Sequence, residues 1–119
     1  RSTMGRELSR HELLVETASA SEVLRDVTSS GDRRRNDDDR LFRYAVAFAW
    51  LRLTEPLCRL ITRRLVGDDA RRTWVGQCDT RNMLAHDRDQ DIDFDPLWAY
   101  LVPTLDRTDA QLDRLMAAS

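Results

Sequence analysis

Three residues within six positions could together act on a phosphodiester. Arg81, Asn82 and His86 bring a fixed cation, an amide and a titratable imidazole into one short segment. Histidine titrates near neutral pH and can move a proton, and arginine presents a planar fork that matches phosphate oxygens. RNA carries its own nucleophile, the 2′-hydroxyl group, so this set could cleave RNA with no metal and no other cofactor. Asn82 could hydrogen-bond the phosphate or orient His86.

The spacing of Arg81 and His86 is not informative by itself. Arginine supplies all 19 basic side chains among 119 residues, so an arginine five positions before a histidine is a common coincidence. Arg6 and His11 have the same spacing. His11 opens the segment H-E-L-L-V, which lacks the second histidine of the helical zinc motif, and it is expected to be a helix-surface residue.

Apolar side chains recur at helical spacing through most of the chain, and no segment alternates polar and apolar residues as a strand would. The first helix is expected over residues 9–28, where Ser9 and Glu12 form a capping-box pattern. Residues 29–38 carry no apolar side chain, so they are expected to form a loop or a frayed segment.

The next apolar pattern predicts a long helix over residues 38–66, with acidic residues at its start and Gly67 closing it. Pro56 either kinks this helix or separates two stacked helices. Core or dimer packing, rather than base stacking, is expected for its aromatic side chains. The apolar stripe comprises Leu41, Tyr44, Ala45, Phe48, Leu51, Leu57, Leu60, Ile61 and Leu65.

Two further helices complete the expected fold. One covers residues 68–86 and is capped by one of its first two aspartates. The other begins at Asp93 or Asp95, holds Pro96 in its first turn and bends at Pro103. The sequence therefore predicts an all-α fold, an antiparallel bundle of four to five helices.

A single domain over residues 1–119 is expected from the length. Residues 1–8 are expected to be disordered or a remnant before the native start. The absence of a long apolar run or a secretion signal predicts a cytoplasmic protein with no membrane contact. Cys58 and Cys78 lack the spacing of a metal or disulfide motif and are expected to be free thiols.

Charge patterns suggest little beyond solvated surfaces. The net charge of −2 argues against general nucleic-acid affinity, and the cluster Arg33–Arg35 is only a weak candidate for contact with an RNA backbone. Alternate aspartates from Asp87 to Asp95 suggest a calcium loop, but no register supplies the glycine and the acidic residue that the EF-hand requires. Helix capping and a solvated loop are expected there.

The flanks of the Arg81–His86 segment distinguish it from the Arg6–His11 copy. Trp74 precedes it, the core reads R-N-x-L-x-H, and an Ile-Asp step, Trp98 and Pro103 follow. This arrangement resembles the HepT-like group of HEPN-domain ribonucleases, which are toxins of bacterial toxin–antitoxin pairs. Thr54-Glu55 resembles the Gly-Glu step of that group. The resemblance covers roughly residues 38–115.

The resemblance implies a HEPN-like helical bundle that forms a homodimer, with an active site of Arg81, Asn82 and His86 at the dimer interface. It also implies an RNA substrate and a cognate antitoxin of the minimal nucleotidyltransferase type. Many members of the group carry a tyrosine two residues after the histidine, which the antitoxin modifies with AMP. Arg88 occupies that position here.

Other interpretations of the same segment remain open. Five helical residues advance about 7.5 Å and turn about 140°, so Arg81 and His86 do not share one helix face. In a purely structural role, Arg81 would pair with a carboxylate such as Glu55 and His86 would cap a helix end. The chain could also be a non-catalytic helical module that binds a nucleotidyltransferase, or a plain interaction domain.

Overall fold

The computed structural model describes residues 7–86 and 94–118, with the side chains of 83–86, 94–97, 101 and 102 outside that description. Five helices and no strand occur within these ranges. The helices are α1 (Arg10–Ser29), α2 (Arg33–Asp38), α3 (Arg40–Thr62), α4 (Asp68–His86) and α5 (Phe94–Ala117). The expectation of an all-α chain is confirmed.

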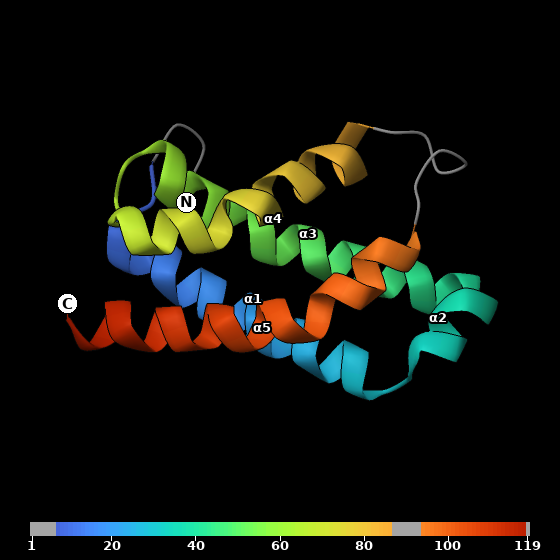
Figure 1. Ribbon diagram of the computed structural model, residues 1–119. Coiled ribbons are helices and arrows are strands. Elements are labelled where there is room, and N and C mark those ends of the chain that lie inside the picture. The colour runs from blue at the N-terminus through green and yellow to red at the C-terminus, as the bar shows by residue number, and fades with distance from the viewer. Residues whose placement is uncertain (1–6, 87–93, 119) are drawn as a thin grey trace, which may run out of the picture.

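The long helices lie side by side and reverse direction from one to the next (Figure 1). α1 and α3 run antiparallel along most of their length, and the short α2 joins them at one end of the molecule. α3 also contacts α4, and α5 contacts α1, α2 and α4. α3 is therefore the central helix against which the proposed site residues of α4 are placed.

The core consists of two clusters, one towards each end of the α1–α3 pair. Trp50 is the largest side chain of one cluster and Trp74 of the other, and both are fully buried. α5 contributes Leu105 to the first cluster and Leu112 to the second. α1, α3 and α5 thus each contribute side chains to both clusters.

The predicted capping box of α1 is present. The Ser9 hydroxyl accepts a hydrogen bond from the backbone N–H of Glu12, and the Glu12 carboxylate accepts one from that of Ser9, each at 3.1 Å. Residues 1–6 of the segment expected to be disordered or a remnant lie outside the described residues, whereas residues 7 and 8 are described. Leu8 packs against the core, and the Glu7 carboxylate lies 3.6 Å from the Arg63 guanidinium.

Residues 33–38 form the helix α2, so the prediction of a loop or frayed segment over 29–38 is wrong there. The Asp32 side chain caps α2 by accepting from the backbone N–H of Arg35 at 2.9 Å. Asn36 is buried, and the Arg35 guanidinium lies 4.5 Å above the ring of Phe42. Contacts with α3 and α5 therefore order a segment that has no apolar side chain of its own.

α3 is one continuous helix with Pro56 inside it, which decides between the two alternatives that the sequence left open. Asp39 caps it by accepting from the backbone N–H of Phe42 at 3.1 Å. Pro56 has no N–H to give to the preceding turn. The carbonyl that loses its helical donor is that of Arg52, four residues earlier, whereas the buried Thr54 hydroxyl donates to the Trp50 carbonyl at 3.1 Å.

The end of α3 differs from the prediction. The helix stops at Thr62, and Arg64 takes the left-handed conformation with φ of 55°. The N–H groups of Arg64 and Leu65 donate to the carbonyls of Ile61 and Leu60, which is the Schellman pattern usually completed by glycine. Arginine therefore ends α3 in the role predicted for Gly67.

Gly67 lies instead at the start of α4, where its carbonyl accepts from the N–H of Arg71 at 3.1 Å. Asp68 and Asp69 consequently occupy the first turn of α4, favourable for negative charge. α5 begins at Phe94 and contains Pro103, and its axis changes direction along its length (Figure 1). None of the helices described is long and apolar enough to cross a membrane.

Part of the apolar stripe predicted on α3 lies on the surface. Leu41 is 78% exposed and Phe48 is 66% exposed, whereas Phe42, Val46 and Trp50 face the core. α3 is apolar on more than one side, so its spacing alone did not show which side is buried. The exposed side lies next to α1.

Candidate functional site

Arg81 on α4 forms an ion pair with Glu55 on α3. Its Nη2 donates to Glu55 Oε2 at 3.2 Å, and the Arg81 side chain is 31% exposed. Glu55 Oε1 also accepts from Arg59 at 3.1 Å, so one carboxylate bridges two guanidinium groups. The pairing expected for Arg81 in a structural role is therefore present, while about a third of the side chain remains open to a ligand.

Asn82 is in direct contact with Arg81. Its Oδ1 accepts from Arg81 Nη1 at 3.2 Å, and its side chain is exposed. The two terminal nitrogens of Arg81 thus have different partners, Glu55 on one and Asn82 on the other. This arrangement fixes the plane of the guanidinium at the surface of α4, where a phosphate oxygen could replace either partner.

His86 is the last residue of α4, and its side chain lies outside the description. The backbone of Arg81 and His86 belongs to one continuous helix, so the argument that they do not share a face applies. Arg88 and the aspartates at 87, 89, 91 and 93 also lie outside the described residues, as does the side chain of Asp95.

A disulfide between Cys58 and Cys78 joins α3 to α4, which makes the prediction of two free thiols wrong. Their Cα atoms are 5.7 Å apart. Cys58 lies one helical turn beyond Glu55, and Cys78 lies one turn before Arg81. The covalent link and the ion pair therefore lie on the same contact face, and the link holds Arg81 opposite Glu55.

The positions of the paired residues along the chain carry a signal for both contacts. The pairs Glu55–Arg81 and Cys58–Cys78 are each centred on residue 68. Contacts along one antiparallel helix pair share one centre, and here that centre lies one residue beyond the turn of residues 63–67 between α3 and α4. A helix-pair interpretation of residues 40–86 would have predicted these contacts together, whereas cysteine motif spacing predicts neither.

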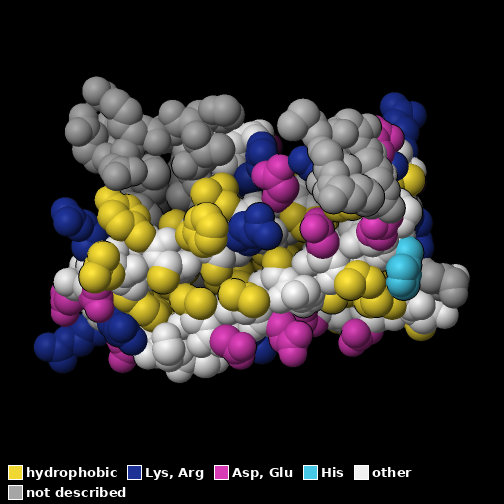
Figure 2. Space-filling model, turned by 180° about the vertical axis from the view of Figure 1, so that it is seen from behind, with side chains coloured by type: hydrophobic (Ala, Val, Ile, Leu, Met, Phe, Trp, Pro, Cys, Tyr) yellow, Lys and Arg dark blue, Asp and Glu magenta, His cyan; other side chains and the backbone are white. Residues whose placement is uncertain are grey.

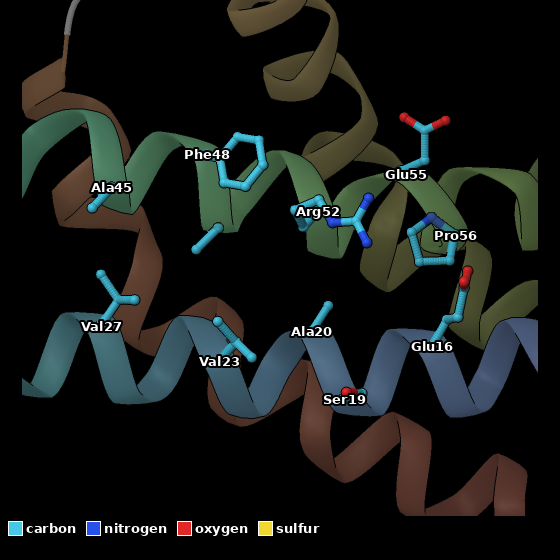
Figure 3. A pocket seen from close by; sticks show the side chains of 11 residues that line it. Glu16, Ser19, Ala20, Val23, Val27, Ala45, Phe48, Arg52, Glu55 and Pro56 are labelled. Atoms are coloured by element: carbon cyan, nitrogen blue, oxygen red, sulfur yellow. The ribbon is translucent and has the colours of Figure 1, made fainter.

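A groove of about 540 Å³ lies between α1 and α3, and Glu55 is at one end of it (Figure 3). The Glu55 carboxylate points out of the groove, away from α1, whereas the Arg52 side chain points into it. Val23 and Val27 of α1 face the groove together with Phe48 of α3. The sequence alone did not identify this groove, because its apolar side chains were expected to pack in the core or at a dimer interface.

The other candidate residues are on separate surfaces. His11 is exposed on α1, as expected. Arg33 and Arg34 are exposed on α2, whereas Arg35 stacks on Phe42 and pairs with Asp39 at 3.3 Å. The arginine cluster is therefore part of a capped helix rather than a solvated loop.

Comparison with family models, with curated proteins and with solved structures finds no match for this chain. The functional conclusion therefore rests on the residues and their geometry.

Proposed function

We propose that this chain is a metal-independent endoribonuclease of the HepT-like HEPN type, the toxin of a bacterial toxin–antitoxin pair. The observation that carries the proposal is the Arg81–Asn82 unit, a guanidinium held at the surface of α4 by side chains that a phosphate can replace. The activity belongs in the cytoplasm, where RNA is available. The cognate antitoxin is of the minimal nucleotidyltransferase type.

Arg81 is the residue that binds the scissile phosphate. As the 2′-hydroxyl attacks phosphorus, negative charge increases on the non-bridging oxygens, and a guanidinium placed beforehand stabilises that charge. Asn82 keeps the guanidinium in position or donates to the same phosphate. His86 takes the proton from the 2′-hydroxyl or gives one to the departing 5′ oxygen, and the product carries a 2′,3′-cyclic phosphate.

A homodimer would bring Arg81 and His86 to one phosphate, which a single chain does not do. Because Arg81 and His86 are about 140° apart around one helix, one copy does not present both to a single phosphate. A two-fold axis near α4 would bring two copies of each residue to one cleft, so that Arg81 of one copy and His86 of its partner act on the same phosphodiester.

The test compares His86→Ala with His11→Ala, because His11 is the only other histidine and lies exposed on α1. His86→Ala should slow cleavage of RNA by at least about a hundredfold, the usual contribution of a general acid or base. His11→Ala should cleave at the native rate, and EDTA should have no effect. Full cleavage and full toxicity of the His86→Ala variant would refute the assignment.

A second candidate function is a non-catalytic module that binds or regulates a nucleotidyltransferase. Two observations favour it: Arg88 occupies the place of the usual modified tyrosine, and Arg81 already has a carboxylate partner. A purified chain that never cleaves RNA, yet binds the nucleotidyltransferase of the adjacent gene tightly, would support this alternative over the ribonuclease.

A further inference from the structure

Two neighbouring links, a disulfide and an ion pair, join α3 to α4 beside the proposed site. On α3, Cys58 follows Glu55 by three residues. On α4, Cys78 precedes Arg81 by the same number. Residues three positions apart lie on one face of a helix. The covalent link and the ion pair therefore lie along one line of contact, about one helical turn from each other.

The two halves of α4 are anchored differently. Ala70, Trp74 and Gln77 of its first half are buried, and Gln77 is also hydrogen-bonded to α5 at 2.9 Å. Beyond Gln77, none of the α4 side chains that the structure describes is buried, and their bonds to α3 are the disulfide and the ion pair. The ribbon of α4 also diverges from α3 towards His86 (Figure 1). The end of α4 that carries the proposed site therefore depends on these bonds for its position.

The covalent link is of a kind that a small thiol opens. Cys58 and Cys78 are both only partly buried, so neither sulfur is enclosed in the core. A thiolate attacks one sulfur, which releases one cysteine and forms a mixed disulfide with the other, and a second thiolate releases that one. The pair gains two electrons and two protons, and the small thiol is oxidised to its own disulfide. A small-molecule disulfide, oxidised glutathione for example, closes the link by the reverse exchange.

We propose that Cys58 and Cys78 form a reversible redox site that controls access of a phosphate to Arg81, a regulation that rests on the proposed function. In the oxidised chain, the link holds Arg81 against Glu55, so the carboxylate occupies the guanidinium. In the reduced chain, an exposed ion pair alone holds Arg81 there, and such a pair shifts an equilibrium by up to about fivefold. A phosphate therefore displaces Glu55 more readily after reduction, and oxidation weakens binding at the site.

The charges on the rest of the surface do little to hide such an effect. On the face that Figure 2 shows, arginine and acidic side chains are interspersed rather than gathered into one basic patch. The net charge of −2 also gives RNA no general attraction to the chain. Binding therefore depends on individual guanidinium groups such as that of Arg81, and a change in its freedom should appear as a change in affinity.

Modification of arginine by phenylglyoxal tests the redox site without RNA, with mass spectrometry of peptides reporting the rate at each arginine. Arg81 should react about twofold to fivefold faster in the chain reduced by dithiothreitol than in the chain oxidised by oxidised glutathione. Arg33, exposed on α2, is the internal control and should react equally in both. Cys58→Ser/Cys78→Ser should show the faster rate at Arg81 in either buffer. Equal rates at Arg81 in the two forms of the native chain would overturn the proposal.

Binding of a short RNA, measured by fluorescence anisotropy, tests the connection to the proposed site. In the His86→Ala background, which prevents cleavage, reduction should lower the dissociation constant by about twofold to fivefold. Glu55→Gln removes the competing carboxylate and should abolish this difference. Glu22→Gln, exposed on α1, is the matched control and should retain it. A difference of the same size in the Glu55→Gln chain would overturn control through the Arg81–Glu55 pair.

The outcomes separate the redox site from the enzyme. Faster modification of Arg81 after reduction, in a chain that neither binds nor cleaves RNA, would support the redox site and count against the ribonuclease. Binding and cleavage of RNA that are the same in both oxidation states would overturn the redox site and leave the ribonuclease proposal standing. A native chain in which oxidised glutathione forms no link between Cys58 and Cys78 would also overturn it.

Discussion

Glu55 is the carboxylate that binds the Arg81 guanidinium in the isolated chain. Its carboxylate accepts from Arg81 at 3.2 Å and from Arg59 at 3.1 Å, and it is 46% exposed. A phosphate that approaches Arg81 must share the guanidinium with this carboxylate or displace it. Glu55 therefore competes with any anionic ligand of the site.

Removal of that negative charge should strengthen binding of RNA. An exposed ion pair contributes up to about 1 kcal/mol, so Glu55→Gln should lower the dissociation constant by up to about fivefold. Fluorescence anisotropy with a short RNA and the His86→Ala background, which prevents cleavage, measures this. Glu22→Gln on the surface of α1 is the control and should show native affinity. Weaker binding by Glu55→Gln would mean that Glu55 positions Arg81 rather than competes for it.

Asp39, the N-cap of α3, is a carboxyl whose ionisation affects that helix. The backbone N–H of Phe42 and, secondly, the Arg35 side chain hold the pKa of this carboxyl below its ordinary value. A lowered pKa in the folded state means that the charged form stabilises the fold above the unfolded pKa of about 4. That contribution is lost as the pH falls through the folded pKa.

Comparison with Asp39→Asn isolates this effect, because asparagine caps a helix equally well and does not titrate. Between pH 6 and pH 3, the melting temperature of the native chain should fall by more than that of the variant. The other carboxylates are common to both proteins and cancel in the difference. Parallel melting curves over this range would show that Asp39 does not couple α3 to pH.

At the scale of elements, the Cys58–Cys78 disulfide makes α3 and α4 one covalent hairpin. The two cysteines are separated by 20 positions, and a closed loop of that size restricts the unfolded chain by about 3 kcal/mol. Dithiothreitol should therefore lower the free energy of unfolding by about that amount in urea titrations. Cys58→Ser/Cys78→Ser should show the lower value with or without the reductant. Identical curves for the native chain in both buffers would exclude the link in solution.

In the cytoplasm, where thiols are kept reduced, the hairpin would lack this link. The Arg81–Glu55 ion pair and the buried hydrogen bond from Gln77 Nε2 to Thr108 Oγ1, 2.9 Å long, would remain to fix α4. The reduced chain is therefore the form to use when the proposed ribonuclease is assayed, and the oxidised chain is its comparison.

Local patterns predicted the elements that local chemistry defines. The Ser9–Glu12 capping box, the acidic start of α3 near residue 38 and the span of α4 depend on hydrogen bonds and charges within a few residues. Features that depend on packing between helices were not predicted. α2 has no apolar pattern, Arg64 takes a conformation typical of glycine, and the disulfide requires that two helices already lie antiparallel.

In the candidate site, too, the residues themselves were predicted from the sequence, whereas the contacts made between helices were not. The sequence supplied Arg81, Asn82 and His86, and it offered Glu55 as one partner of Arg81. It did not supply Arg59 as the second guanidinium on that carboxylate, nor the groove that begins at Glu55. Those relations arise where α3 meets α1 and α4, and they depend on which side of an apolar helix is buried.

At the scale of the whole molecule, α3 has a different neighbour on each side. One side is buried in both core clusters, a second carries the site shared with α4, and a third borders the open groove with α1. The proposed site and the groove lie within one turn of each other on α3, at Glu55 and Arg52.

The turn between α3 and α4 lies inside the loop that the disulfide closes, and Arg64 is exposed there in its left-handed conformation. A protease that cuts after Arg64 would break the polypeptide without releasing a fragment. The two pieces would migrate as one species on a gel until a reductant is added. A nicked chain could therefore keep Arg81 beside Glu55, with its two halves held together by sulfur instead of by backbone.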